Sequence, residues 1–599
     1  MEPGELLDRA PERGAPDRVV GVFRRAASGG RIDPADRRDR GEYQIAAGDT
    51  ADATDGELVA GELLPARRYG PPRARVVERL GAADSPRTIS LISIAQFEIP
   101  HAFPQAALAE AAAAKPADSG GRVDLRGLDL VTIDGSDARD FDDAVWAEPD
   151  PDAANPGGWR LVVAIADVAH YVTPDSALDR EARERGNSVY FPDRVVPMLP
   201  EALSNGLCSL KPGEDRACLA AELWIDRNGV KRRHAFHRAI MRSAAQLTYE
   251  QVQAAQDGAA AAAIARERLA ALYGAFAALD RARVARGALA LDLVEYRVVL
   301  DAAGAPAAVE PRQRLDSHRL IEEFMILANV AAAEELEAKR LPCLYRVHDA
   351  PTPDRLDALR QALADIDAPG LALAKGQVIR PELFNRVLTR VVGRPEAQLV
   401  NDLVLRAQAQ AIYSPDNIGH FGLALRRYAH FTSPIRRYAD LLVHRALLGE
   451  ATPATALDAI GKHVSATERR ATAAERAALE RYRARLLGGR IGEEFAARVN
   501  GVARFGLFVT LTDSGTDGLL PIGSLPPDFY RFDARHLTLS GRHSRRRFGL
   551  GDALTVRLAE ADPIGGRLTF RLDEGVPNRP RVAVKRHRPR PGRQTGRRR

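Results

Sequence analysis

Five carboxylates crowd into ten residues of this chain, between two largely apolar runs that are typical of buried strands. Residues 134–143 read Asp-Gly-Ser-Asp-Ala-Arg-Asp-Phe-Asp-Asp, with the apolar runs at 128–133 and 144–146. Crowded carboxylates repel one another and resist shared ionisation, so a fold that holds them beside buried strands usually neutralises them with a cation. The stretch therefore predicts either a site for a hard, oxygen-preferring ion such as Mg²⁺ or a solvated acidic loop.

A calcium loop of the helix-loop-helix kind does not fit this stretch. Counting from Asp134, the ligand positions three and five would be Ser136 and Ala138. Position six, where a sharp turn needs Gly, would be Arg139, and position twelve, where a bidentate Glu belongs, would be Val145. The spacing excludes this class of site.

The length of 599 residues exceeds what one hydrophobic core usually supports, so we expect several domains. Residues 19–84 alternate short apolar runs with polar, Gly-rich turns, which predicts a small β-barrel. Alternation returns over residues 493–571 and predicts a second, five-stranded barrel. Between them, helical periodicity predicts helices over 317–337, 353–364, 381–411 and 454–487.

Cysteine usage and hydropathy point to the cytoplasm. Only Cys208, Cys218 and Cys343 occur, with no CxxC pair, so we expect reduced and buried thiols. No uninterrupted apolar stretch reaches the ~18 residues that a membrane span needs, and the first 14 residues contain no apolar core of a signal peptide. We expect a cytoplasmic protein without membrane association.

The positive charge of the chain is concentrated at its end. Residues 576–599 contain ten Lys or Arg and no acidic residue, so the rest of the chain carries −4 of the total charge of +6. A segment rich in Pro, Gly and Arg cannot bury enough apolar surface to fold, yet it suits a polyanion. RNA, DNA, an acidic membrane or a merely solubilising role would each account for this tail.

Residues 430–438 read His-Phe-Thr-Ser-Pro-Ile-Arg-Arg-Tyr and favour a phosphate site at a helix start. Ser433 is predicted as the N-cap and Pro434 as the first helical residue. Arg436 and Arg437 then lie in the first turn, where basic residues oppose the helix dipole unless an anion binds there. Ordinary surface arginines beside a capped helix are the alternative.

Aromatic and acidic candidates outside these motifs have two interpretations each. Tyr190 in Ser-Val-Tyr-Phe-Pro could stack on a base or pack in a core beside Phe191. Glu468 could form a helical ion pair. Phe505 and Phe508 could be stacking platforms or core residues, and only the face on which they lie would decide.

Three distinctive segments follow one another in the chain, at residues 131–144, 188–210 and 419–438. Together they resemble the ribonuclease II and ribonuclease R family of RNB-domain exoribonucleases. The acidic sequence Asp-Ala-Arg-Asp-Phe-Asp-Asp at 137–143 and the basic tail are most similar to the ribonuclease R branch. The resemblance implies a processive, hydrolytic 3′-to-5′ exoribonuclease acting in RNA decay and quality control. It would release nucleoside 5′-monophosphates and leave a short oligonucleotide.

The fold implied by this resemblance is multidomain α+β, with OB-type barrels on both sides of a mixed α/β nuclease domain. The predicted parts are a flexible N-terminus (1–18), a cold-shock-like OB barrel (19–84), a connecting segment (85–125), the RNB catalytic domain (126–488), a C-terminal OB-fold RNA-binding domain of the ribosomal-protein S-one type (489–574) and a disordered basic tail (575–599).

The resemblance also implies a metal centre. The four matching active-site carboxylates are Asp134, Asp140, Asp142 and Asp143, with Asp142 expected to be catalytic as well and Asp137 outside the set. Two Mg²⁺ ions during catalysis would activate a water for in-line attack on the terminal phosphodiester and stabilise the departing 3′ oxygen.

The resemblance also implies RNA-contacting roles for other residues. Arg436 matches the arginine that grips the scissile phosphate, and Arg437 is a weaker second candidate. Tyr190 matches the aromatic that stacks near the 3′ end, and Glu468 matches a glutamate that positions the terminal nucleotide. The resemblance does not place the family's second stacking aromatic, and the region 341–345 offers only Tyr345.

One departure from the ribonuclease R pattern concerns the N-terminus. That pattern begins with a helix-turn-helix segment and two cold-shock barrels, whereas this sequence has room for one barrel before residue 85. We expect a monomer acting on single-stranded RNA, and the departure puts structured RNA with a 3′ overhang in doubt. A catalytically inactive RNA-binding regulator and a metal phosphodiesterase on DNA or a small nucleotide stay as alternatives. The four carboxylates disfavour the first, and the barrels disfavour the second.

Overall fold

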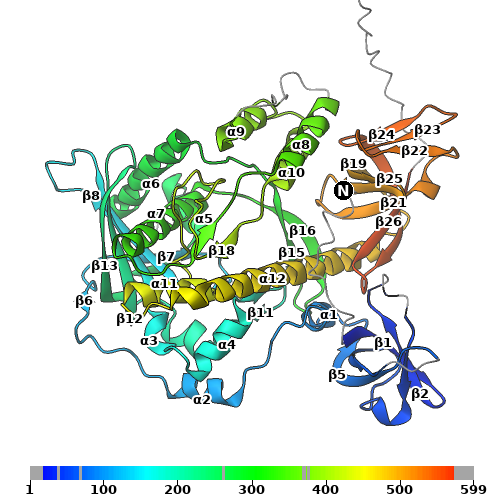
Figure 1. The fold of residues 1–599 in the computed structure, drawn as a ribbon, viewed down its shortest axis with the longest axis horizontal. Coiled ribbons are helices and arrows are strands. Elements are labelled where there is room, and N and C mark those ends of the chain that lie inside the picture. The colour runs from blue at the N-terminus through cyan, green and yellow to red at the C-terminus, as the bar shows by residue number, and fades with distance from the viewer. Residues whose placement is uncertain are drawn as a thin grey trace, which may run out of the picture.

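The computed structural model describes residues 18–572, apart from 37, 38, 40, 66–69, 260–262, 367–372 and 374–377. The predicted basic tail and all but the last residue of the predicted flexible N-terminus therefore lie outside the described residues. Figure 1 shows a large central α/β body with two small β structures stacked along one side of it. Within the described ranges, no helix combines the length and apolar character that a membrane span requires.

The N-terminal structure is a curled five-stranded antiparallel sheet with strand order β3-β2-β1-β4-β5. Its inward side chains, including Phe23, Ile32 and Val59, form a core of their own. The amide of Gln44 donates to the carbonyl of Pro72 at 2.9 Å, which brings β3 beside the start of β5 and nearly closes the sheet. The predicted N-terminal OB-type barrel is confirmed. Its elements are β1 (Arg18–Ala26), β2 (Gly29–Pro34), β3 (Tyr43–Ala46), the 3₁₀ turn Ala47–Asp49, β4 (Glu57–Leu63) and β5 (Ala74–Ala82).

The central body is built on a seven-stranded mixed sheet with strand order β14-β7-β8-β9-β12-β13-β6. Two short helices, α1 (Thr88–Gln96) and α2 (Gln105–Ala113), connect the N-terminal barrel to it. The strands are β6 (Val123–Asp124), β7 (Val131–Asp134), β8 (Asp143–Pro149), β9 (Trp159–Ala166), β12 (Asp215–Ile225), β13 (Lys231–Arg242) and β14 (Ala245–Thr248).

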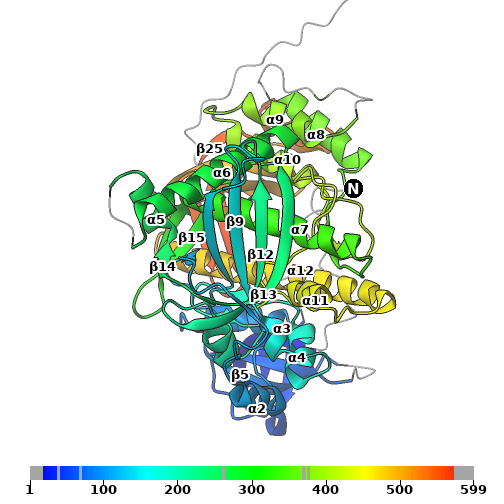
Figure 2. The same ribbon diagram turned by 90° about the vertical axis from the view of Figure 1, so that its left-hand side faces the viewer.

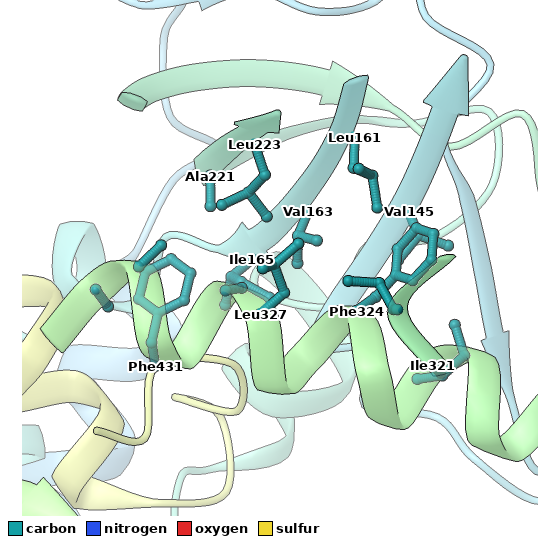
Figure 3. Close-up of a cluster of buried hydrophobic side chains, with 14 of the residues drawn as sticks. Val145, Leu161, Val163, Ile165, Ala221, Leu223, Ile321, Phe324, Leu327 and Phe431 are labelled. Carbon is teal, nitrogen blue, oxygen red and sulfur yellow. The ribbon is translucent and has the colours of Figure 1, made fainter. Parts of the chain in front are cut away.

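Side chains alternate between the two faces of this sheet, and each face buries a separate core. Val145, Leu161 and Val163 point to the face covered by α6 and α7, where Phe324 and Leu327 of α7 meet them (Figure 3). The opposite face packs against α2, α4, α11 and α12. Figure 2 shows the sheet strands with helices on both sides of them. The helices are α3 (Val168–Tyr171), α4 (Ala177–Arg185), α5 (Tyr249–Gln256), α6 (Arg266–Arg286), α7 (Asp316–Ala338), α11 (Tyr438–Leu447) and α12 (Ala454–Gly488).

Short elements fill the remainder of the body. The single helix predicted over 381–411 is wrong: it is two helices, because Gly393 adopts φ +72° and Pro395 follows two residues later. The remaining elements are β10 (Val189–Tyr190), β11 (Val195–Val196), the π turn Ala202–Leu207, β15 (Glu295–Leu300), β16 (Pro306–Arg312), β17 (Tyr345–Val347), α8 (Pro353–Asp365), α9 (Pro381–Thr389), α10 (Ala397–Ala407) and β18 (Ile412–Ser414).

The C-terminal structure is a closed five-stranded barrel, as the sequence predicts, with strand order β19-β20-β21-β26-β25. A three-stranded sheet, β22-β23-β24, is inserted between β21 and β25 and was not predicted. The elements are β19 (Glu494–Ala503), β20 (Gly506–Leu511), β21 (Asp517–Pro521), the 3₁₀ turn Ile522–Ser524, β22 (Tyr530–Asp533), β23 (Thr538–Gly541), β24 (Arg547–Gly549), β25 (Ala553–Asp562) and β26 (Arg567–Leu572).

Candidate active site

The acidic stretch is the connection between two neighbouring strands of the central sheet. Asp134 is the last residue of β7 and Asp143 is the first residue of β8. The buried ring of Phe141 anchors the loop between them. Its amide donates to Ser209 Oγ at 3.1 Å, and Ser209 Oγ donates to the carbonyl of Arg139 at 2.8 Å. The loop is therefore held at both its strand ends and its middle, which excludes the solvated alternative for its second half.

Asp142 is the most buried member of the set, with 4% of its surface exposed. Its Oδ1 accepts a hydrogen bond from the amide of Ile435 at 2.9 Å. Its Oδ2 is buried without a hydrogen bond and lies 3.5 Å from Nε of Arg436. Burial raises the pKa of Asp142 well above its usual value, although Arg436 and the Ile435 amide oppose this shift. Oδ2 therefore has the Arg436 guanidinium beside it but accepts no hydrogen bond.

Asp134 and Asp143 lie at the same end of the sheet as Asp142. Burial, with a smaller contribution from Asp134, raises the pKa of Asp143 to about 7. Burial also raises the pKa of Asp134. The amide of Gly135, which donates to Asp134 Oδ1 at 2.8 Å, partly opposes this rise. Unlike these two, Asp137 is exposed on the loop.

The carboxylates fit a divalent cation by their chemistry. Their oxygens are the ligands that Mg²⁺ prefers, and a cation beside them would reverse the cost of ionising crowded, buried acids. Oδ2 of Asp142, which is buried and accepts no hydrogen bond, is also free to ligate an ion. As the side chains stand, no group of three or more His, Cys, Asp or Glu among the described residues is closely enough gathered to hold one ion.

The turn that carries Arg436 differs from the prediction. The predicted helix start at Ser433 and Pro434 is wrong, because α11 begins at Tyr438. The amide of Tyr438 donates to the carbonyl of Gly186, and the carbonyl of Arg436 accepts from the amide of Ser188 at 3.0 Å. These distant partners hold the backbone in an extended conformation just before the helix, so Arg436 projects from a turn and not from a helical first turn.

Asp440 organises this turn, and sequence reasoning missed it. Its fully buried carboxylate accepts the amide of Ser433 at 2.8 Å. It also accepts both Nε and Nη2 of Arg437, at 2.8 and 2.7 Å. Arg437 is thus committed to an internal ion pair, whereas the side chain of Arg436 is 45% exposed. The only sequence signal was the spacing of three residues between Arg437 and Asp440.

Tyr190 lies at the edge of the carboxylate loop. Its hydroxyl donates to Asp140 Oδ2 at 3.2 Å, and 40% of the residue is exposed. Glu475 of α12 accepts its amide at 2.7 Å. Burial, and after it the charge of Asp140, raises the pKa of the Tyr190 hydroxyl. The ring is therefore not a core aromatic, unlike Phe191, which is buried.

Glu468 of α12 forms a bidentate ion pair with Arg346, at 2.7 and 2.9 Å. The guanidinium of Arg346 lies 4.6 Å from the ring centre of Tyr413, so the glutamate is held in a fixed orientation with a third of its side chain exposed. In contrast, Tyr345 is buried and its hydroxyl donates to Glu337, so the structure gives this candidate no free face for stacking.

Phe505 and Phe508 lie on the outside of the C-terminal barrel. Phe505 is 55% exposed in the turn before β20. Phe508 is half-buried, and its strand neighbours Leu507 and Val509 fill the barrel interior. The two rings meet edge to face at 5.9 Å. Their facing therefore agrees with the stacking interpretation.

A further aromatic, Tyr249, was not singled out from the sequence. It opens α5 directly after β14, whose Thr248 pairs in register with Asp134. Its ring stacks on His318 at 4.0 Å. Burial, followed by the charges of Asp134 and Asp143, raises the pKa of its hydroxyl. Only the pairing of β14 with β7 brings Tyr249 to this site, and a single sequence does not reveal that pairing.

Comparison with known proteins agrees with this geometry. The model of the RNB domain matches residues 122–450, and that of the cold-shock domain matches residues 32–104. Ribonuclease R of Escherichia coli (strain K12) is 40% identical over 581 residues, which cover 92% of this chain and 70% of that protein. The chain belongs to the ribonuclease R family. The family resemblance and the multidomain α+β fold inferred from the sequence are confirmed, as is the class of enzyme, a 3′-to-5′ exoribonuclease.

Solved structures place the fold in the same family. Mycoplasma genitalium RNase R in complex with ribose methylated single-stranded RNA superposes with a TM-score of 0.88 at 26% identity, covering 94% of this chain and 90% of that one. Yeast Ssd1, a pseudonuclease, shares the fold with a TM-score of 0.68 at 17% identity, over 88% of this chain and 68% of that one. RNB exoribonucleases depend on divalent metals, and the four carboxylates of this ribonuclease R family member suit that requirement.

The raised pKa of Asp143 predicts how pH affects stability without metal. The folded chain keeps this proton up to about pH 7, whereas the ordinary value is 3.8. Between these values the folded state binds more protons than the unfolded state, so stability should fall as pH rises. Asp143→Asn should flatten this fall. The measurement is the melting temperature in EDTA between about pH 4 and 7, with the exposed Asp137→Asn as control. Equal slopes for wild type and Asp143→Asn would contradict the prediction.

The bonds of Asp440 predict a loss of rate in Asp440→Asn. The amide oxygen can still accept the Ser433 amide, but Arg437 loses its charged partner and the turn with Arg436 should shift. We expect the single-turnover rate at saturating RNA to fall about tenfold or more, with KM little changed. Asp179→Asn is the matched control, because it breaks another buried ion pair of α11, with Arg445 at 2.7 Å. The idea fails if both variants lose stability and rate equally.

Proposed function

We propose that this chain is a processive, Mg²⁺-dependent exoribonuclease that degrades single-stranded RNA from its 3′ end to nucleoside 5′-monophosphates. The observation that carries the proposal is the meeting of Asp142 with the Ile435 amide and the Arg436 guanidinium, from segments almost 300 residues apart. A buried acid and an exposed arginine at one point suit a reaction on a phosphodiester. Its place in RNA decay, as a cytoplasmic monomer, stays a prediction from the sequence.

The four carboxylates would hold the metal. Two Mg²⁺ ions bound there would supply an activated water and stabilise the leaving 3′ oxygen. The protein contributes their positions: Asp134 and Asp143 on strand ends, Asp142 fixed by the Ile435 amide, and Asp140 fixed by the Tyr190 hydroxyl. The burial that raises the pKa of three of them is the cost that metal binding offsets.

Arg436 would hold the scissile phosphate and stabilise the charge that develops on it. Its guanidinium is oriented before substrate arrives, because Nη2 donates to Ser433 Oγ at 3.0 Å and Nε faces Asp142. Asp440 and Arg437 would act as positioning residues for this turn. Arg437 as a direct RNA contact remains the weaker assignment.

The RNA strand would lie along the exposed aromatic and acidic side chains described above. Tyr190 would stack on the bases nearest the 3′ end, with Glu468 positioning the terminal nucleotide. Phe505 and Phe508 would form a second stacking surface on the C-terminal barrel. The inactive RNA-binding alternative is not favoured by the family comparison. Structured RNA with a 3′ overhang is a further proposed substrate.

The domain boundaries inferred from the sequence remain proposals. They are supported by the ends of elements: β5 ends at Ala82, α12 ends at Gly488 and β19 begins at Glu494.

The class of reaction is tested with labelled substrates. Single-stranded RNA labelled at its 5′ end should be shortened to a small limit product in Mg²⁺, with release of nucleoside 5′-monophosphates. EDTA should abolish the reaction, and DNA of the same sequence should persist. Equal degradation of DNA would favour the phosphodiesterase alternative, and RNA binding without hydrolysis would favour the regulator.

Asp142→Asn should separate binding from chemistry. The substitution removes a charge with little change of shape, so hydrolysis should fall below about one tenth of wild type while RNA binding persists. Single-turnover cleavage and a binding titration in EDTA measure the two effects. Asp137→Asn, on the same loop but exposed, should keep its rate. Retained turnover in Asp142→Asn would overturn the metal-site assignment.

Tyr190→Ala should lengthen the limit product. Stacking contributes roughly 1–3 kcal/mol per base, so losing the ring should release the RNA earlier and leave a longer oligonucleotide. Tyr190→Phe keeps the ring but loses the hydrogen bond to Asp140, so its limit product should match wild type. The readout is the ladder of end products on a sequencing gel, and an unchanged ladder for Tyr190→Ala would return this ring to a structural role.

A further inference from the structure

The three-stranded sheet inserted into the C-terminal barrel has two unlike faces. We call residues 528–549 the arm. Phe532, Leu539 and Phe548 are register partners across its strands, and they pack into the core of the barrel. The opposite face carries the register partners Arg531, Ser540 and Arg547. Two like charges on one face of a small sheet repel each other, which an anion would relieve.

The outer surface of the arm is strongly basic. It contains six arginines, all exposed, and two acidic residues. Within the part of the chain that the structure describes, none of the six arginine side chains forms an ion pair. The arginines are Arg531, Arg535, Arg542, Arg545, Arg546 and Arg547.

The acidic residues of the arm shape its turns. Asp533 lies two residues from Arg531 on the same face of β22, but the structure shows no ion pair between them. Asp528 accepts the amide of Ser544 at 2.7 Å, its hydroxyl at 2.6 Å and the amide of His543 at 3.1 Å. Asp533 accepts the amide of Arg535 at 3.0 Å. The turn that bears most of the arginines is therefore fixed in shape, so less ordering is needed when a ligand binds.

An aromatic surface accompanies the charge. Phe529 is 76% exposed, and the ring of His543 lies 6.3 Å from it in a tilted arrangement. A single exposed ring is a small area for insertion into a membrane, but it is enough to stack on one base. Phosphate-binding arginines with an adjacent free ring match a single-stranded nucleic acid better than a lipid surface.

The arm lies far from the carboxylates. Figure 1 shows it at the end of the C-terminal barrel that points away from the N-terminal barrel, across the molecule from β7 and β8. Its base touches α10, where a Cβ on Gly551 would meet Leu399. A short oligonucleotide held at the carboxylates would not extend to this surface, whereas a long strand could contact both.

We propose that the arm is a separate binding site for single-stranded RNA, in which arginines hold backbone phosphates and Phe529 stacks on a base. It holds the strand on the 5′ side of the segment being degraded. The proposal rests on the proposed function for the identity of the ligand as RNA, but not on the chemistry at Asp142.

The test compares two triple variants of the full chain. Arg542→Gln, Arg546→Gln and Arg547→Gln remove three charges from the arm. Arg183→Gln, Arg266→Gln and Arg340→Gln remove three exposed charges from the central body and control for net charge. Affinity for a single-stranded RNA of about 40 nucleotides is measured in EDTA over a series of salt concentrations. The arm variant should bind about tenfold or more weakly at low salt, with a slope of log K against log salt shallower by about 2, from about 0.7 per phosphate contact.

A second variant and a short substrate complete the test. Phe529→Ala should weaken binding of the long RNA about fivefold with an unchanged salt slope. Single-turnover cleavage of an oligonucleotide of about eight nucleotides in Mg²⁺ should be normal in every variant, because it engages only the carboxylate site. Absence of cleavage in the wild type would refute the proposed function and leave the binding result standing.

Three outcomes would overturn the arm site. The first is parallel salt lines for the arm variant and wild type. The second is an equal loss of affinity in the control triple, which would reduce the effect to net charge. The third is unchanged RNA affinity together with loss of binding to phosphatidylglycerol vesicles, which would assign the surface to acidic lipid.

Discussion

The hydrogen bond from the Ile435 amide to Asp142 is the constraint on which the site depends. It joins the loop between β7 and β8 to the turn before α11, and so places Arg436 against the carboxylates. The same turn is tied to residues 186–188 through the amides of Tyr438 and Ser188. Because Tyr190 lies two residues after Ser188, one network fixes the acidic loop, Arg436 and Tyr190 relative to one another.

This network is built at a cost to the stability of the metal-free protein. Three carboxyls have raised pKa values chiefly because they are buried, and one oxygen of Asp142 is buried without a hydrogen bond. Two buried ion pairs brace the elements around this network: Asp440 with Arg437, and Asp179 with Arg445. A cation site requires acidic side chains held close together in a fixed geometry. A loop packed with apolar side chains in their place would be more stable without metal but would not bind the ion.

Local patterns in the sequence were sufficient for the elements and insufficient for their junctions. The acidic stretch, both barrels and the long helix α12 follow from alternation, periodicity and charge spacing. The helix start at Ser433 was wrong because the decisive bonds come from Gly186 and Ser188, about 250 residues away, and outweigh the preference for Ser and Pro at a helix start. Tyr249 was missed for the same reason, since its place depends on the pairing of β14 with β7. Asp440 was missed although its partners Ser433 and Arg437 lie within seven residues, because an acid three residues from an arginine is common on helices and does not by itself indicate a buried ion pair.

Two neighbouring arginines show that residue type alone does not determine the role of a side chain. Arg436 and Arg437 are adjacent and identical in chemistry, yet one faces Asp142 with an exposed side chain and the other is enclosed in an ion pair with Asp440. The arm presents the opposite case: its arginines are scattered over 17 positions in the sequence, 531–547, and antiparallel register brings Arg531 and Arg547 to one face. In both places the fold decides whether a guanidinium is enclosed by a carboxylate, as in Arg437, or keeps an exposed surface that can bind a phosphate, as in Arg436 and the arginines of the arm.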